Sequence, residues 1–293
     1  MLSILIPTYN YNTFSLVNEL QKQAKETGIE FEILVLDDGS QKLETENNKI
    51  NELDFCSFEI LKENIGRSAI RNLLAKKASF DNLLYLDSDT IPVANDFISN
   101  YLIHLNEEEK IVYGGIQYQK EKPKKSHLLR YKYGHSREAL CVKTREENPY
   151  LRFLTLNFMI KKSVFEKVNF NETIPNLRHE DTLFSYQLKQ AKIPIIHIEN
   201  PVFHLGLDDF EMAIKKENES IIALKFLIEN NHIPKNYIGL SRLFYSIQKM
   251  KLVFVVAILF RITKPFLLKN LASKNPSLFV FDIYRLGYFS SLF

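Results

Sequence analysis

Short apolar runs alternate with helix-like segments along most of the chain. The run at residues 83–86 has the continuous apolar character of a buried strand, and the largely apolar segments 2–7, 31–36 and 58–61 also predict strands. Residues 14–20 place their apolar side chains near helical spacing. This alternation of strand and helix predicts an α/β fold, with a mostly parallel, doubly wound sheet that carries helices on both faces.

The pattern continues in the second half of the chain. It predicts strands at residues 111–118, 151–160 and 193–198. Residues 120–137 are basic and loop-like, which fits either a mobile loop for an anionic acceptor or a solvated surface loop. Asp208 and Glu211 resemble a capping box and predict the start of a helix that reaches about residue 229.

Acidic side chains follow the predicted strands where these strands end. Asp37 and Asp38 follow the second run, and Asp87 and Asp89 follow the run at 83–86. Side chains two apart on an extended chain point to the same face, and open α/β sheets bind ligands at the carboxyl ends of their strands. We therefore expect Asp87 and Asp89 to project together toward a hard divalent cation, Mg²⁺ or Mn²⁺, although a solvated turn also explains a lone Asp-x-Asp.

Two predicted helix starts carry charged side chains. Asn64 is the expected N-cap of a helix on which Arg67 and Arg71 lie four residues apart, a spacing suited to a phosphate or ribose and equally to a solvated basic face. Glu180 and Asp181 open a second helix, where the helix dipole favours acids even without a catalytic role.

Composition narrows the class of protein. The 293 residues suffice for a substantial core, and 45% hydrophobic with 25% charged residues is ordinary for a globular protein. Cys56 and Cys141 form no metal-ligand pattern, and the first residues lack the basic region of a signal peptide, so we expect a cytoplasmic protein. Residues 1–235 carry 30 basic and 34 acidic side chains, which argues against a nucleic-acid partner.

The positive charge belongs to the end of the chain. Residues 236–293 contain eight Lys or Arg and one acid, so we expect a main domain over 1–235 and a helical, basic and apolar extension over 236–293. The apolar run at 252–260 is too short to span a bilayer. The extension fits an amphipathic segment on an anionic membrane surface, at the inner face of the cell membrane, and fits equally a helical hairpin packed on the domain or on a second subunit of a homodimer.

Six motifs occur in a fixed order: IPTYN, DDGS, NIGRSAIRN, LYLDSDT, HEDTLF and PVFH. Together they resemble the family 2 glycosyltransferases over about residues 2–206. The resemblance implies the GT-A (nucleotide-diphospho-sugar transferase) fold and transfer of a hexosyl or N-acetylhexosaminyl group, with inversion, from a nucleotide sugar to an acceptor hydroxyl. It favours UDP by family frequency alone, a glycan or lipid-linked acceptor, and a role in cell-surface polysaccharide synthesis.

The resemblance also assigns roles to residues. Asp38 would accept a hydrogen bond from the base, and Gly66 would allow the backbone to approach the nucleotide. The nucleotide-sugar residues it implies are Pro7, Thr8, Tyr9, Asp38, Asn64, Gly66, Arg67, Arg71, Asp87 and Ser88.

For the chemistry, the resemblance makes Asp181 the base that takes the proton of the acceptor, with Glu180 orienting the site. Asp89 is the best expected ligand of the divalent metal, with Asp87 and His204 beside it. A lone His at such a position is also commonly structural.

Departures and alternatives remain. The segment LTLNF keeps only Asn157 where the family often has a Gly and paired Asn residues, and the chain has no Trp, which argues against a processive polymerase with a Gln-x-x-Arg-Trp motif. A sugar nucleotidyltransferase would need a Gly-rich phosphate loop after the first strand, and IPTYNYN has none. A non-catalytic nucleotide-sugar-binding protein stays open.

Overall fold

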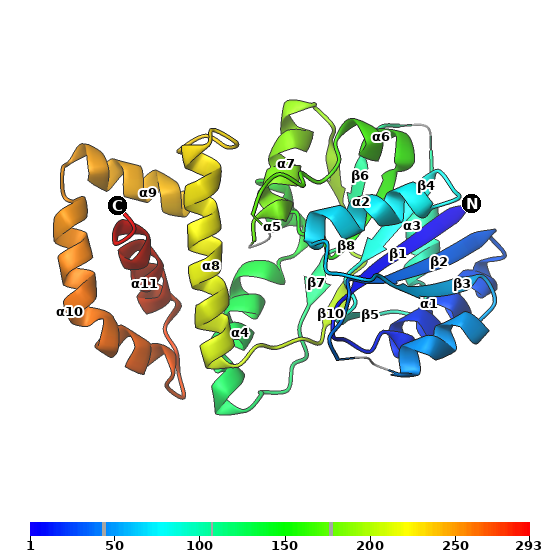
Figure 1. The fold of residues 1–293 in the computed structure, drawn as a ribbon, viewed down its shortest axis with the longest axis horizontal. Coiled ribbons are helices and arrows are strands. Elements are labelled where there is room, and N and C mark those ends of the chain that lie inside the picture. Colours follow the sequence, from blue (N-terminus) through cyan, green and yellow to red (C-terminus); the bar gives the residue numbers. More distant parts are fainter. Residues whose placement is uncertain (43–44, 107, 176–177) are drawn as a thin grey trace. The chain divides into compact units, whose positions relative to one another are not determined.

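The computed structural model describes residues 1–42, 45–106, 108–175 and 178–293 (Figure 1). The chain forms two compact units. The first unit comprises Met1–Gln119, Ala139–Asn176 and Glu180–Gly206. The second unit comprises Lys120–Glu138, Leu177–His179 and Leu207–Phe293.

Within the described residues, the first unit contains a seven-stranded sheet in the order β3-β2-β1-β4-β8-β6-β9. Strand β8 is antiparallel to β4 and β6, and the other neighbours are parallel, which confirms the mostly parallel sheet. Its strands are β1 (Leu2–Thr8), β2 (Phe31–Asp37), β3 (Cys56–Ile60), β4 (Asn82–Leu86), β6 (Ile111–Tyr113), β8 (Asn157–Lys161) and β9 (Ile195–His197).

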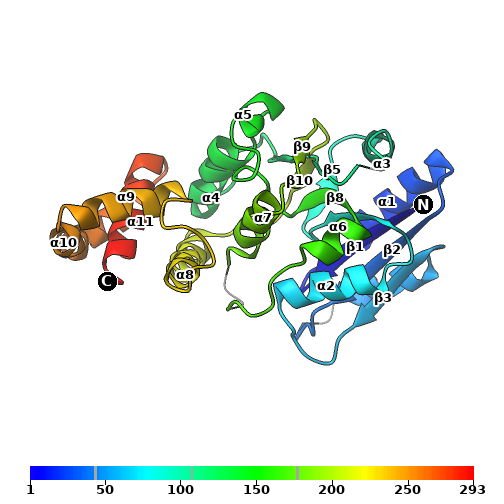
Figure 2. The ribbon, with the colours of Figure 1, turned by 90° about the horizontal axis from the view of Figure 1, so that it is seen from above.

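Helices cover both faces of this sheet (Figure 2). On one face lie α1 (Phe14–Thr27) and α3 (Phe97–Leu102), and on the other lie α2 (Arg67–Lys77), α6 (Lys162–Lys167) and α7 (Glu180–Gln190). The short α5 (Val142–Glu146) precedes β8 along the chain. Alternate strand residues such as Leu83 and Tyr85 pack with Phe158 and Phe184 in one buried cluster. Leu83, Leu84, Tyr85 and Leu86 of β4 are all buried, as the continuous apolar run predicted.

A second, three-stranded sheet lies in the same unit, with the order β5-β10-β7. It consists of β5 (Thr90–Pro92), β10 (Val202–His204) and β7 (Ile116–Gln117). The single strand predicted over 111–118 is wrong, because the chain turns at Gly114 and Gly115, where Gly115 has φ 97°, and passes from one sheet to the other. The antiparallel register places His204 opposite Thr90, next to Asp89.

Three other local predictions are corrected. Residues 120–137 are largely helical, with a 3-10 turn at Lys125–His127, α4 (Leu128–Tyr133) and a π turn at Gly134–Glu138, because Leu128 and Leu129 are buried. The strand predicted over 151–160 begins only at Asn157. The start of α8 (Phe210–Glu229) is capped by Asp209, whose Oδ1 accepts a hydrogen bond from the backbone N–H of Met212 at 2.8 Å, instead of by Asp208 and Glu211.

The second unit is helical. Besides α4 and α8 it contains α9 (Gly239–Lys249), α10 (Val253–Leu271) and α11 (Leu278–Ser290). Phe260 and Leu271 of α10 pack with Phe281 and Tyr284 of α11, and a Cβ on Gly287 would come within 2.4 Å of the Phe260 ring. The helical extension expected from the sequence is therefore present. In the part of the chain that the structure describes, no helix is long and apolar enough to cross a membrane.

Candidate active site

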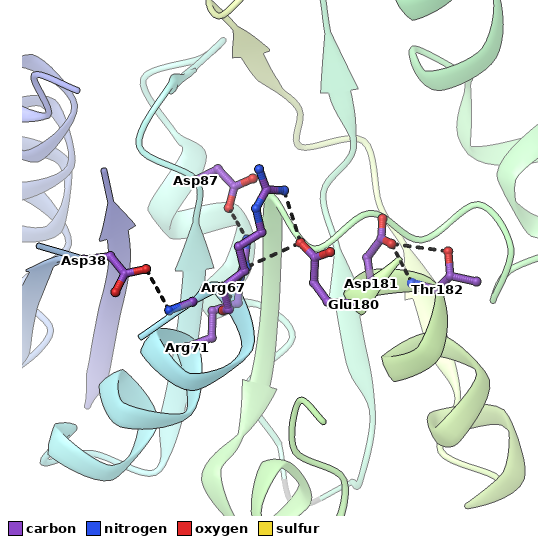
Figure 3. A network of polar contacts seen from close by, with 8 residues as sticks. Asp38, Arg67, Arg71, Asp87, Glu180, Asp181 and Thr182 are labelled. Carbon is purple, nitrogen blue, oxygen red and sulfur yellow. Dashed lines mark hydrogen bonds and ion pairs between the residues drawn. The ribbon is translucent and has the colours of Figure 1, made fainter. Parts of the chain in front are cut away.

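The buried Arg71 joins elements that are far apart in the sequence (Figure 3). Its Nη2 lies 2.7 Å from Oδ1 of Asp87, which follows β4. Its Nη1 lies 3.9 Å from Oε1 of Glu180 at the start of α7, and Nη1 of Arg67 lies 3.4 Å from the same oxygen. The structure thus brings together both predicted arginines and two of the predicted acids at the carboxyl end of the sheet.

The Arg71 guanidinium remains a cation in this position. Its side chain is only 7% exposed, and burial by itself lowers the pKa of the guanidinium. The facing carboxylates of Asp87 and Glu180 outweigh burial and raise the pKa above its usual value. A buried charge needs such partners, because its desolvation cost is otherwise uncompensated.

Asp181 follows Glu180 in the first turn of α7. Its pKa is raised to about 6, first by burial and then by the neighbouring charge of Glu180. Hydrogen bonds from Thr182, whose backbone N–H donates to Oδ1 at 2.6 Å, oppose this rise. A carboxylate with a pKa close to working pH is ionised there and still binds a proton well, which is what proton abstraction requires.

Asp89 and His204 form a second pair. The antiparallel register of β5 and β10 leaves Nε2 of His204 3.3 Å from Oδ2 of Asp89. Gly206 leaves room for this carboxylate, because a Cβ there would lie 2.3 Å from Oδ2. Two neighbouring ligands of one octahedral ion with bonds of ~2.1 Å lie about 3 Å apart, so the pair has a spacing that fits a single divalent cation. An imidazole beside a carboxylate suits Mn²⁺.

Asp87 does not join the Asp89 and His204 pair. Its carboxylate accepts a hydrogen bond from Arg71 instead. Among the described residues, no group of three or more His, Cys, Asp or Glu side chains is placed to hold a metal. The three predicted metal residues are thus divided between two clusters, and a cation here would need ligands from a substrate or water, as Mg²⁺ sites on phosphate substrates commonly have.

The loop between β3 and α2 is held by Asp38. The backbone N–H groups of Ile65 and Gly66 donate to its Oδ1 and Oδ2 at 2.7 and 3.1 Å, and Asn64 Nδ2 donates to its carbonyl oxygen at 3.0 Å. Burial raises the pKa of Asp38, although these N–H groups lower it in part. The N-cap predicted at Asn64 is wrong, because Gly66 occupies that position with φ 92° and ψ 164°, a conformation essentially restricted to glycine.

The remaining predicted nucleotide residues lie at the ends of β1 and β4. Thr8 is buried opposite Asp37 in the sheet register, and its hydroxyl donates to the carbonyl oxygen of Tyr11 at 3.3 Å. Pro7 is half-buried, and Tyr9 is 44% exposed. Ser88 is half-buried in the turn after β4.

The sequence did not single out Tyr11, and it singled out Asn157 only as a departure from the family pattern, without a structural role. The pKa of Tyr11 is raised by burial and by the charge of Asp89, so its hydroxyl lies within the field of that carboxylate. Asn157 is fully buried, donates to the carbonyl oxygens of Gly115 and Asn200 at 2.9 and 3.0 Å, and accepts a hydrogen bond from Tyr101. In the sequence, only the position of a lone Asn in an apolar run suggests that this side chain forms buried hydrogen bonds to three other segments.

More than half of the chain matches the sequence model of a known family. A sequence model described as glycosyl transferase family 2 matches residues 3–169. The chain belongs to glycosyltransferase family 2. An uncharacterized glycosyltransferase of Haemophilus influenzae is 28% identical over 211 residues, which cover 67% of this chain and 75% of that protein. The uncharacterized glycosyltransferase YfnE of Bacillus subtilis is 33% identical over 119 residues, which cover 38% of this chain but only 29% of that protein.

Solved structures share the fold. Staphylococcus aureus TarS 1-349 in complex with UDP has a TM-score of 0.52 at 16% identity, covering 97% of this chain and 89% of that one. The mannosyltransferase PcManGT from Pyrobaculum calidifontis, in complex with GDP-Man and Mn²⁺, has a TM-score of 0.52 at 14% identity, covering 78% of this chain and 64% of that one. The family 2 chain therefore has the GT-A fold of glycosyltransferases.

Proposed function

We propose that this chain is an inverting, metal-assisted glycosyltransferase that moves a sugar from a nucleotide diphosphate sugar to an acceptor hydroxyl. The observation that carries the proposal is Asp181, a carboxyl group with a pKa raised to about 6 beside the Arg71, Asp87 and Glu180 cluster. We further propose a UDP sugar as donor and a glycan, free or lipid-linked, as acceptor in cell-surface polysaccharide synthesis.

In this proposal Asp181 takes the proton of the attacking hydroxyl, because inversion needs one base on the face opposite the leaving group. Glu180 orients the acceptor side, and its own position is fixed by Arg67 and Arg71, whose Nη1 atoms lie 3.4 and 3.9 Å from Oε1. The ionised Asp181 is favoured above about pH 6, so the base is ready at neutral pH.

The donor would lie along the carboxyl ends of β1, β2 and β4. Pro7, Thr8 and Tyr9 would border the base together with Asp38, while Asn64, Gly66, Arg67 and Arg71 would border the phosphates and ribose. Asp87 and Ser88 would contact the ribose or the sugar. The UDP and GDP-Man complexes of two proteins with the same fold support a nucleotide sugar as donor.

Asp89 and His204 would hold the divalent cation, with Asp87 close by in the same turn. When bound, Mn²⁺ or Mg²⁺ would neutralise the negative charge that develops on the departing diphosphate. The 3.3 Å spacing of the Asp89 and His204 side chains and the Mn²⁺ present in the PcManGT complex support this assignment.

A thermal-shift panel of nucleotides and nucleotide sugars, each with Mn²⁺, Mg²⁺ or EDTA, tests the proposal. A ligand at 100 times its dissociation constant stabilises the native state by about 2.7 kcal/mol, which raises the melting temperature by on the order of 5 °C. We expect a metal-dependent shift with UDP or a UDP sugar and release of UDP from that sugar. A shift without release under any condition would favour the non-catalytic binding protein, and the absence of any shift would contradict the proposed donor class.

A further inference from the structure

Helix α10 has two apolar sides, of which one is buried against other described residues and the other is largely exposed. Phe260 and Leu271 are buried in the cluster with α11, which lies between α10 and α8 (Figure 1). Residues four apart line one side of a helix, and the series Phe254, Ile258, Ile262 and Phe266 is 75%, 39%, 64% and 73% exposed. At 3.6 residues per turn, this series lies roughly opposite Phe260. We call these four residues, with the exposed Val255 and Leu259, the outer face of α10.

The segment that carries the outer face is basic. Residues 230–281 contain no Asp or Glu. Lys251, Arg261, Lys264 and Lys269 are exposed, and none of them forms an ion pair with the residues that the structure describes. By contrast, Arg285 of α11 pairs with Glu217 of α8 at 2.6 Å. The unpaired cations thus gather around the apolar helix, whereas the arginine inside the unit is neutralised.

We propose that the outer face of α10 lies on an anionic phospholipid bilayer. Exposed apolar side chains on one side of a helix, bordered by Lys and Arg, are the features that hold a helix in the plane of a membrane interface. The apolar side enters the headgroup region, while the long basic side chains extend back to the lipid phosphates. This inference concerns attachment alone and goes beyond the proposed transferase activity without depending on it.

Charge favours a bilayer over a second copy of this chain as the occupant. In a twofold contact, each outer face would meet an identical one. The basic side chains of both copies would then approach each other, and residues 230–281 offer no acid to pair with them. Like charges brought together oppose association, whereas anionic lipid supplies the missing opposite charge.

Flotation of the full chain with vesicles tests the proposal. We expect binding to phosphatidylcholine vesicles that contain phosphatidylglycerol, weaker binding as salt is added, and little binding to phosphatidylcholine alone. Phe254→Gln with Phe266→Gln should weaken the binding by roughly tenfold or more, because two exposed aromatic side chains no longer enter the interface. The matched control is Ile103→Gln with Leu151→Gln, at positions 77% and 40% exposed on the first unit, which should bind as the unaltered chain does.

A second pair of variants tests the charges. Arg261→Gln, Lys264→Gln and Lys269→Gln together should abolish the preference for anionic vesicles, while Lys22→Gln with Lys76→Gln, also exposed, should preserve it. Equal flotation with both lipid mixtures, or unchanged flotation of the Phe254 and Phe266 variant, would overturn the proposal. A second copy would be the occupant if the unaltered chain does not bind vesicles, sediments as a dimer in their absence, and becomes a monomer when Phe254 and Phe266 are replaced. Nucleotide-dependent thermal shifts of the same variants report on the donor site separately.

Discussion

Nη2 of Arg71 lies 2.7 Å from Oδ1 of Asp87, so a buried cation on α2 neutralises the first acid of the Asp-Ser-Asp turn. The same guanidinium faces Glu180, the residue before the proposed base. The first acid is therefore held toward α2 and α7, while the second, Asp89, is held toward His204. One turn supplies two clusters with different partners.

Removing the Arg71 charge should destabilise the fold. Arg71→Met removes the cation that pairs with Asp87 and one of the two arginines near Glu180, and breaking a buried pair in this way costs about 3 kcal/mol. Arg67→Met is the matched control, because the Arg67 side chain is 48% exposed and an exposed pair contributes about 0.5 kcal/mol. Urea unfolding followed by circular dichroism measures both values, and equal losses in the two variants would contradict the structural role of Arg71.

The rate should depend on the protonation of Asp181. Because only the ionised carboxylate accepts a proton, kcat/KM for donor hydrolysis should rise with pH, with its midpoint at about pH 6, and then level off. Glu180→Gln should move the midpoint to lower pH, because the Glu180 charge helps to raise the pKa of Asp181. An unchanged midpoint in this variant would argue against the coupling of the two groups.

The contribution of Asp181 to stability should fall as the pH rises, whereas the rate rises. The pKa of Asp181 is raised from an unfolded value near 3.9 to about 6 in the native state, so the native state binds this proton more tightly. The stabilisation of the native state by this bound proton is fully present below about pH 4 and is lost as the pH rises through about 6. When the pH is raised from 4 to 7, the melting temperature of Asp181→Asn should therefore fall less than that of the unaltered chain. Equal falls would show that Asp181 does not titrate in this range.

The Asp89 and His204 pair should determine metal affinity. His204→Ala should raise the Mn²⁺ concentration needed for the nucleotide-dependent thermal shift by about tenfold or more. Even a residue that only hydrogen-bonds to a metal ligand typically lowers the metal affinity about 10–100-fold when it is replaced. His104→Ala changes a half-buried His elsewhere in the first unit and is the matched control. Calorimetric titration of Mn²⁺ in the presence of UDP gives the same comparison without turnover, and equal affinities in both variants would remove His204 from the metal site.

Gly66 should tolerate no side chain. Its φ of 92° and ψ of 164° are essentially restricted to glycine, so Gly66→Ala should cost about 1–3 kcal/mol and loosen the backbone held by Asp38. Gly239→Ala, at the first residue of α9 where a Cβ meets nothing within 4 Å, should be neutral or stabilising. Thermal unfolding of the two variants separates backbone strain from the general effect of an added methyl group.

The sequence predicted the sheet well because each buried strand needs an apolar run, and the alternation with helices admits few topologies. The prediction was wrong where one apolar run contains strands of two different sheets. The run at 111–118 is apolar on either side of Gly114 and Gly115 apart from Gln117, and this pair of glycines is its signal for the turn between β6 and β7. The many basic side chains of residues 120–137 predict a loop, whereas the burial of Leu128 and Leu129 accompanies a helix.

The candidate site was predicted as a set of residues, but its pairing was not. Spacing suggested that Asp87 and Asp89 project together from an extended strand, yet β4 ends at Leu86, and the hydroxyl of Thr90 donates to the carbonyl oxygen of Asp87 at 2.7 Å. This turn sends the two carboxylates to different partners. The contact of His204 with Asp89 depends on the β5 and β10 register, which is set by strands more than 100 residues apart and leaves no local signal.

The most direct test of the account compares donor binding and turnover in Asp181→Asn. The substitution keeps the size of the side chain and removes its basicity, so binding of a UDP sugar with Mn²⁺ should be preserved. UDP release, with water as the acceptor, should fall by roughly 10²–10⁴-fold. The exposed Asp96→Asn is the matched control and should change neither the binding nor the release. Unchanged release of UDP by Asp181→Asn would contradict the assignment of Asp181 as the base.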